Sequence, residues 1–350
     1  MNMDNSEIVI GMSYPIAVTE ESTNFLDGIN MAVEEINSKG VLGKKIRIQK
    51  VDDEGSVTTG SEVAQSFVDN PKISAVIGHW NSRVSNAVAD IYNRNRIVMI
   101  TPASTSPRLT TKGYEYVFSM INDDIAYGST MARYAAKTGL DKVVIYYADD
   151  DYGRGLANAF EDAAYENQIQ VVDRTTSING KNIHGFIDKW NAFDYNAIFI
   201  ADVMESAIEV IETIRAAGIQ TPIMGATGID RNSFIETLGD YTKEIAMPTT
   251  FDPTLQTLEM KTFVQDYEEI YGYMPDTWAA QGYETVKLLC QAIESAGSAM
   301  PDKIAKALSE TSDYQGISGV LNCNSKGEII GAEIYVKVVE NGEYVYLGKY

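Results

Sequence analysis

Short runs of β-branched and aliphatic residues recur along this chain, and segments whose apolar residues have helical spacing separate them. The runs occupy residues 8–10, 46–48, 73–77, 97–100, 143–147, 169–172 and 197–200. Strands that alternate with helices build βαβ units, and the strands of such units lie parallel in one sheet. The alternation therefore predicts an α/β fold with mainly parallel, doubly wound sheets.

The helical segments carry their own boundary signals. Apolar residues recur at helical spacing from Phe25 to Ile36, Ser22 and Thr23 precede them as candidate N-caps, and Gly40 follows as a stop. After about residue 250 the alternation ends. There we expect helices at 255–271, 277–296 and 302–310, and strands near 320, 334–339 and 344–347.

Two stretches of the chain echo one another. A strand that begins at Ile46 leads through a helix to a second strand that ends at Ile77, and the same order of elements runs from Ile169 to Ile200. Two similar α/β lobes would produce this spacing, although many doubly wound folds would do so too. A length of 350 residues also suggests two domains, at roughly 150 residues per domain.

Composition excludes some classes of function. The chain has 28 Lys and Arg against 49 Asp and Glu, a formal net charge of −21, which argues against nucleic-acid binding because phosphates need surplus cations. The apolar runs fall far short of the ~18 residues that span a bilayer, so no membrane insertion of this segment is expected. Residues 1–6 lack the features of a signal peptide. Either the protein is intracellular or a targeting segment has been removed.

Motifs for catalysis are missing from the sequence. Neither GxGxxG nor GxxxxGK[ST] occurs, there is no GxSxG elbow, and His79 and His184 have no His or Cys partner at metal-ligand spacing. Cys290 and Cys323 have no CxxC spacing and fit either packing residues or one optional bridge. We therefore predict no catalytic residues, no cofactor and no metal.

Polar residues follow two of the expected strands. Trp80, Asn81 and Ser82 come after the strand that ends at Ile77, and the loop after Ile100 contains Ala103, Ser104 and Thr105 between two prolines. Ligands of open α/β sheets sit at the carboxyl ends of strands, and hydroxyls and free N–H groups suit a carboxylate. An ordinary N-cap at Ser82 and a strand-exit turn are the structural alternatives.

The segment 76–114, with VIGH at its start and MITPA within it, resembles the branched-chain amino-acid binding proteins of ABC importers. Further similar segments lie in order along essentially the whole chain, at 11–13, 32–37, 51–53, 151–155 and 214–218. The resemblance implies two Rossmann-like lobes joined by three hinge crossings, the periplasmic-binding-protein-like type I fold. The lobes would comprise residues 1–123 plus 253–332 and residues 124–252 plus 333–350.

The resemblance also implies roles for individual residues. Ser82, Ala103 and Thr105 match the positions that hold the ligand's α-carboxylate, and Tyr152 matches an aromatic residue that the second lobe brings down on closure. The carboxylate that pairs with the ligand ammonium in relatives falls on Thr227, and a second family tyrosine falls on Val203.

Thr227 cannot supply charge, and a buried ammonium without an anionic partner costs several kcal/mol. Either another acid takes over or the ligand has no ammonium. Asp202, at a strand end, ranks first among the available acids, ahead of Asp230 and Asp124.

The side-chain pocket would be lined by Tyr14, Trp80 and Trp278, where aromatic residues favour apolar or flat groups. Simple core packing is the alternative for each tryptophan. The cysteine pair of some relatives is absent, because Gly55 and Asn81 stand at those places.

Our leading hypothesis is a non-enzymatic, extracytoplasmic solute-binding protein, in the periplasm or on a cell-surface lipoprotein. It would deliver a small carboxylate-bearing ligand, a neutral aliphatic or aromatic amino acid, to the membrane subunits of an ABC permease. The alternatives are a ligand-sensing receptor or regulator of the same fold, a binder of a carboxylate without an amine, and an enzyme.

Overall fold

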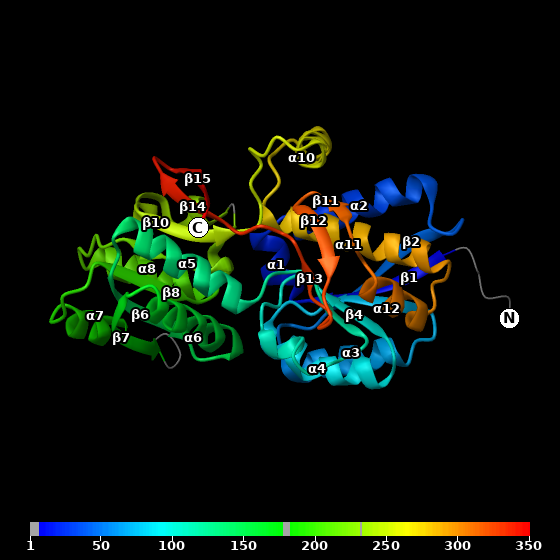
Figure 1. Ribbon diagram of the computed structural model, residues 1–350, viewed down its shortest axis with the longest axis horizontal. Coiled ribbons are helices and arrows are strands. Elements are labelled where there is room, and N and C mark those ends of the chain that lie inside the picture. The colour runs from blue at the N-terminus through cyan, green and yellow to red at the C-terminus, as the bar shows by residue number, and fades with distance from the viewer. Residues whose placement is uncertain (1–6, 178–182, 232) are drawn as a thin grey trace. The chain divides into compact units, whose positions relative to one another are not determined.

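The computed structural model describes residues 7–177, 183–231 and 233–350. Residues 1–6, on which the signal-peptide expectation rests, lie outside them. The chain forms two compact units, which we call unit 1 (Met1–Asn122 and Pro253–Ala332) and unit 2 (Asp123–Asp252 and Glu333–Tyr350). Both units are drawn in Figure 1.

Unit 1 is built on a five-stranded sheet of order β2-β1-β3-β4-β5, in which all pairs are parallel. Its strands are β1 (Glu7–Tyr14), β2 (Lys45–Asp52), β3 (Ile73–Gly78), β4 (Val98–Thr101) and β5 (Val117–Ser119). The strand order reverses direction between β1 and β3. This reversal is the switch point at which open α/β sheets bind ligands.

Helices cover both faces of this sheet (Figure 1). On one face, α3 (Val57–Val68) and α4 (Ser82–Arg94) bury an apolar core with the sheet that includes Phe67, Val88 and Val76. The other helices of unit 1 are α1 (Ile16–Ser22), α2 (Phe25–Lys39), α10 (Leu258–Tyr271), α11 (Thr277–Ala296), α12 (Pro301–Ser309) and the short 3₁₀ helix η1 (Pro107–Leu109). A small antiparallel sheet joins β11 (Tyr314–Gly316), β12 (Gly319–Cys323) and β13 (Ile329–Ile330).

Unit 2 contains a seven-stranded sheet of order β15-β14-β10-β9-β8-β6-β7. Its strands are β6 (Lys142–Ala148), β7 (Gln170–Ser177), β8 (Ala197–Ala201), β9 (Ile223–Met224), β10 (Ile245–Thr249), β14 (Tyr335–Glu340) and β15 (Glu343–Lys349). The strands β6 to β10 pair in parallel, whereas β14 and β15 add antiparallel. Here the order reverses between β6 and β8, so unit 2 repeats the switch point of unit 1.

The helices of unit 2 enclose a second apolar core that includes Trp190, Ile198 and Phe234. They are α5 (Asp124–Thr138), α6 (Asp151–Glu166), α7 (Ile183–Trp190), α8 (Met204–Ala216) and α9 (Ser233–Leu238), with the 3₁₀ helices η2 (Thr227–Ile229) and η3 (Gly239–Thr242). Among the residues that the structure describes, no helix combines the length and apolarity needed to cross a membrane.

The N-cap prediction for the first long helix is wrong. Asn24 occupies the N-cap position of α2, because Ser22 already ends the separate short helix α1. Thr23 accepts a bond from the backbone N–H of Phe25 at 3.3 Å, just before the helix. The stop at Gly40 is confirmed, with φ of +81° at the C-cap.

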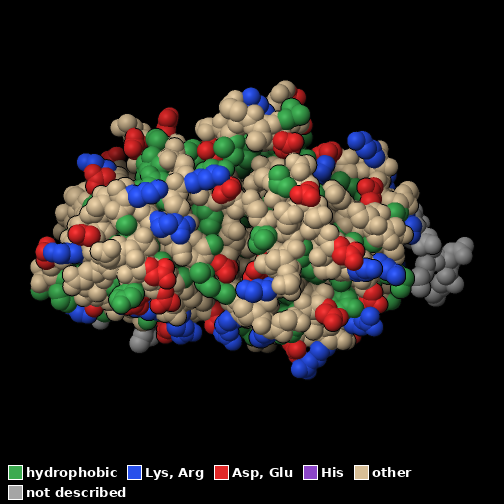
Figure 2. Space-filling view, viewed as in Figure 1, with side chains coloured by type: hydrophobic (Ala, Val, Ile, Leu, Met, Phe, Trp, Pro, Cys, Tyr) green, Lys and Arg blue, Asp and Glu red, His purple; other side chains and the backbone are tan. Residues whose placement is uncertain are grey.

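The surface drawn in Figure 2 carries acidic and basic side chains side by side. On that face the negative charge is spread out and does not gather in one patch. Such a solvated acidic surface favours solubility and does not indicate which ligand the protein binds.

Candidate functional site

The carboxyl edge of the unit 1 sheet brings together the end of β1 and the segment that follows β3. Asn81 takes the N-cap position of α4 without a side-chain capping bond, and Ser82 is the first residue of the helix. The alternative of Ser82 as an ordinary N-cap is therefore wrong. The Ser82 hydroxyl is buried and lies 3.4 Å from the Ser104 hydroxyl.

The loop after β4 lies next to the start of α4, and hydrogen bonds to the Thr101 side chain hold it in place. The Thr101 hydroxyl oxygen accepts bonds from the backbone N–H of Ser104 at 3.0 Å and of Ala103 at 3.4 Å. Thr105 is 2% exposed, and its hydroxyl has no hydrogen-bond partner among the described residues. The same holds for Oδ1 of Asn81. Buried polar groups are almost always paired, so a free hydroxyl here points to a ligand.

An aromatic cluster adjoins this edge in unit 1. The rings of Trp80 and Trp278 have centroids 4.6 Å apart, Phe25 packs edge-on against Trp80, and Tyr14 packs edge-on against Phe25. Tyr14 and Trp278 are buried, whereas Trp80 retains part of its exposure. The Tyr14 hydroxyl donates to Oε1 of Glu20 at 2.6 Å, which fixes the Tyr14 ring within the cluster. Trp80 is therefore the member of the cluster with surface left to contact a ligand.

In unit 2, Tyr152 lies in the first turn of α6, directly after β6. Its hydroxyl oxygen accepts a bond from the backbone N–H of Gly228 at 2.9 Å and shares a bond with the Thr227 hydroxyl at 3.1 Å. Burial raises the pKa of Tyr152 well above its ordinary value, so the group remains a neutral phenol. Tyr152 and Thr227, which are distant in sequence, thus meet at one edge of the sheet.

Asp202 follows β8 at the unit 2 switch point and is buried. Its Oδ1 accepts bonds from the Val203 backbone N–H at 2.7 Å and from the Ser206 hydroxyl. Burial raises the pKa of Asp202 to about 6, against the lowering effect of these two bonds. Val203 is the N-cap residue of α8 and adds no polar side chain.

The other two acids considered for the ammonium differ from Asp202. Oδ1 of Asp230 lies 2.5 Å from Nζ of Lys337, and both side chains are buried, so Asp230 is already neutralised. Asp124 is buried in the first turn of α5, where Gly155 leaves room for its carboxylate. The ranking of Asp202 ahead of Asp124 stays a prediction.

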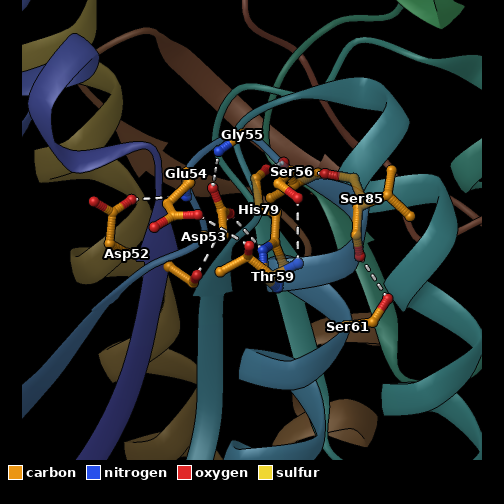
Figure 3. Close-up of polar contacts among 12 residues, drawn as sticks. Asp52, Asp53, Glu54, Gly55, Ser56, Thr59, Ser61, His79 and Ser85 are labelled. Atoms are coloured by element: carbon orange, nitrogen blue, oxygen red, sulfur yellow. Dashed lines mark hydrogen bonds and ion pairs between the residues drawn. The ribbon is translucent and has the colours of Figure 1, made fainter.

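A buried polar network that the sequence does not reveal lies beneath the unit 1 edge (Figure 3). His79 is fully buried, and its ring bonds to Oδ2 of Asp53 at 2.6 Å and to the Tyr92 hydroxyl at 3.1 Å. Its backbone oxygen accepts bonds from the hydroxyls of Ser85 at 3.0 Å and Thr101 at 2.8 Å. The only signal in the sequence is that Asp53 and His79 each follow a strand.

Neither cysteine forms a disulfide: Cys290 and Cys323 are both free. Burial raises the pKa of the Cys290 thiol to about 12 and that of Cys323 to about 11, so both thiols stay protonated at neutral pH. Over residues 7–177, 183–231 and 233–350, no group of three or more His, Cys, Asp or Glu side chains could hold a metal ion.

Comparison with known proteins places this arrangement in a family. A family model described as periplasmic binding protein matches residues 7–343. The Leu/Ile/Val-binding protein of Escherichia coli is 28% identical, over 94% of this chain and 89% of its own length.

Two solved structures are also similar. The ABC transporter substrate-binding protein from Desulfitobacterium hafniense, solved in complex with Leu, is 36% identical with a TM-score of 0.87, and the match covers 97% of this chain and 100% of that one. A leucine binding protein from Thermotoga maritima is 29% identical with a TM-score of 0.90, covering 97% of each chain.

These matches confirm the predicted α/β type I fold and the resemblance to branched-chain amino-acid binding proteins. They also confirm the prediction that the chain belongs to a family of binding proteins and not to a family of enzymes. The chain belongs to the periplasmic binding protein family.

Proposed function

We propose that this protein is the extracytoplasmic solute-binding component of an ABC importer and binds a small ligand through its carboxylate. The observation that carries the proposal is the buried Thr105 hydroxyl, which has no partner among the described residues and lies in the loop next to Ser82. Hydroxyl and amide donors of Ser82 and Thr105 would bind the carboxylate without a cation, beside Ala103, whose N–H bonds to Thr101. Ser104, whose hydroxyl bonds to Ser82, completes the group.

Residues of unit 2 would contact the same ligand on closure. Tyr152 and Thr227 offer hydroxyls, and Asp202 offers a carboxylate whose contacts with described residues all fall on Oδ1. Oδ2 is then left to accept from a ligand ammonium. An ammonium moved out of water needs such a partner, so a neutral α-amino acid is the proposed ligand.

The side chain of the ligand would lie against Trp80 and Asn81, with Trp278 and Tyr14 behind them. A flat or branched apolar group suits such an aromatic surface. Neutral aliphatic and aromatic amino acids are therefore the proposed ligands, and the proposed partners are the membrane subunits of a permease that accepts the ligand-loaded form.

A second candidate is a carboxylate without an amine. It is favoured by Thr227, which carries no charge, and by the pKa of Asp202 near 6, which keeps part of this carboxyl protonated in mildly acidic solution. A protonated Asp202 can donate to a neutral or anionic group of the ligand, as an ionised one cannot.

A thermal-shift and calorimetric screen tests the proposal, because a ligand that binds the folded state raises its stability by RT ln(1 + [L]/Kd). The panel contains the neutral amino acids and their amine-free carboxylates. We expect at least one amino acid to bind, and Thr105→Val to weaken that binding by about 1.5–3 kcal/mol, the value of a hydrogen bond to a charged group. No binding by any member, or full affinity in Thr105→Val, would contradict the proposal. Binding of amine-free acids alone would favour the second candidate.

A further inference from the structure

One backbone oxygen joins the two segments that carry the proposed carboxylate donors. The His79 oxygen accepts from the Ser85 hydroxyl of α4 at 3.0 Å and from the Thr101 hydroxyl at the end of β4 at 2.8 Å. Ser85 lies one turn after Ser82, and Thr101 in turn accepts from the N–H groups of Ala103 and Ser104. A continuous chain of hydrogen bonds therefore runs from His79 to the loop.

The His79 ring is fixed from two further elements. Oδ2 of Asp53, after β2, lies 2.6 Å from Nδ1, and the Tyr92 hydroxyl of α4 lies 3.1 Å from Nε2. Asp53 is itself held, because its Oδ1 accepts from the Gly55 N–H at 2.9 Å. In Figure 3 the Asp53 carboxylate and the His79 ring point toward one another.

The backbone beside His79 is packed as tightly as its ring. Gly78 has φ of +146°, and a Cβ at this position would lie 2.5 Å from the backbone oxygen of Ser13. Only glycine allows β1 and β3 to approach this closely before the turn into His79. The side chains of His79, Asp53 and Thr101 are all fully buried. A buried polar network whose members are satisfied rigidifies its surroundings.

We propose that Asp53, His79 and Thr101 form a positioning network that holds the 103–105 loop against the start of α4, so that the carboxylate donors are in place before a ligand arrives. The network does not touch the ligand. The inference rests on the proposed function, since it explains how the donor set is held. Preorganised donors bind more tightly because little conformational freedom is lost on binding.

Thr101→Val tests the network with little change of volume. The variant removes one hydroxyl, which leaves the His79 oxygen and the N–H groups of Ala103 and Ser104 without that partner. We expect ligand affinity to fall by about tenfold, because the loop donors are no longer held in place before binding. Amide hydrogen exchange at residues 103–105 of the ligand-free protein should become faster. Thr101→Ser, which keeps the hydroxyl, should restore both.

Thr285→Val is the matched control in unit 1. Thr285 is also fully buried, and its hydroxyl donates only to the backbone oxygen of Gln281 within α11 at 2.7 Å. This variant should lower the melting temperature by a similar amount and leave ligand affinity and loop exchange unchanged. The comparison separates positioning of the loop from general stability.

The outcomes distinguish this inference from the proposed function. If the wild-type protein binds no member of the panel, the proposed function fails. If the wild type binds and Thr101→Val binds equally well, the network has no positioning role and the proposed function stands. Equal losses of affinity in Thr101→Val and Thr285→Val, or no recovery in Thr101→Ser, would also overturn the inference. Should Thr101→Val not fold, Ser85→Ala removes the other bond to the His79 oxygen and should weaken binding. Ser61→Ala, which removes a hydroxyl that bonds only to the Val57 oxygen within α3, should not.

Discussion

The two units share a strand order but differ in the chemistry at the switch point. The order β2-β1-β3-β4-β5 across the sheet of unit 1 corresponds to the order β7-β6-β8-β9-β10 across the sheet of unit 2. At the carboxyl edge, the proposed donor set of unit 1 is neutral and comes from Ser82 and the 103–105 loop, whereas the proposed contacts of unit 2 are a phenol, a threonine and the acid Asp202. The same scaffold thus gives one edge suited to an anion and another that can accept from a cation.

The units also differ in what lies beneath the edge. In unit 1 the buried Asp53–His79 pair supports the loop and leaves no acid in the donor set. In unit 2 the acid Asp202 is itself at the edge, and burial raises its pKa to about 6. We therefore expect binding through unit 1 to be insensitive to pH near neutrality and binding through unit 2 to depend on it.

The largest expected effect concerns a buried acid of unit 1 that lies away from the edge. Glu284 of α11 accepts from the hydroxyl and N–H of Ser318, and burial raises its pKa from 4.5 to about 7. The folded state therefore holds this proton more tightly than the unfolded state. The contribution of Glu284 to the free energy of unfolding is fully present below pH 4.5 and is lost as the pH rises through about 7, by roughly 3 kcal/mol.

Glu284→Gln should remove this loss, which thermal unfolding of both proteins at several pH values would measure. Gln retains an oxygen that accepts from Ser318. Ligand affinity should stay unchanged, because Glu284 is not part of the donor set. A pH dependence of stability that is identical in the two proteins would show that Glu284 does not titrate in this range.

Ser82→Ala tests the anionic character of the unit 1 edge. It should weaken binding of any carboxylate ligand by about 1.5–3 kcal/mol, the value of a hydrogen bond to a charged group. Titration calorimetry measures the change, with Ser61→Ala as the control, because the Ser61 hydroxyl is exposed and bonds only within α3. Unchanged affinity in Ser82→Ala would remove Ser82 from the site.

Asp202→Asn tests whether the carboxyl edge of unit 2 binds the ammonium of the ligand. Asn retains an oxygen for the Val203 N–H and the Ser206 hydroxyl but carries no charge, so binding of an amino acid should weaken by roughly tenfold. Its amine-free analogue should bind both proteins equally. In the wild type, amino-acid affinity should fall as pH decreases through about 6, where Asp202 becomes protonated. Equal effects on both ligands would mean that Asp202 does not contact the ammonium.

Tyr152→Phe has the smallest expected effect. It leaves the Gly228 N–H and the Thr227 hydroxyl without a phenol partner, which costs about 0.5–1.5 kcal/mol for a neutral bond. The loss should appear in the ligand dissociation rate, measured by stopped flow. Tyr165→Phe, at a highly exposed position, serves as the reference. A Tyr152→Phe variant that releases ligand at the wild-type rate would exclude this role.

Much of the fold could be predicted because long elements carry a clear period. The helix expected at 277–296 is α11 within the same limits, and the echo between 46–77 and 169–200 corresponds to β2–β3 and β7–β8. The strand β10, of five residues and interrupted by Pro248, was missed, and so were β5, β9, β11 and β13, of two or three residues each. Strands this short are too brief to show alternation, and tertiary pairing alone defines them.

The candidate site was predicted from strand ends and from resemblance, and its ligand contacts stay a prediction. What the sequence could not show is the support beneath it. His79 had no recognisable partner because Asp53 lies 26 residues earlier, on another strand end. The neutralisation of Asp230 by Lys337 was equally hidden, since β14 returns to unit 2 late in the chain.

The most direct test of the central claim compares the tightest-binding neutral amino acid with its carboxamide, in which an uncharged amide replaces the carboxylate. If hydroxyl and amide donors of unit 1 bind the carboxylate, calorimetry should show the carboxamide binding at least about a hundredfold more weakly. A carboxamide that binds as tightly as the amino acid would contradict the account.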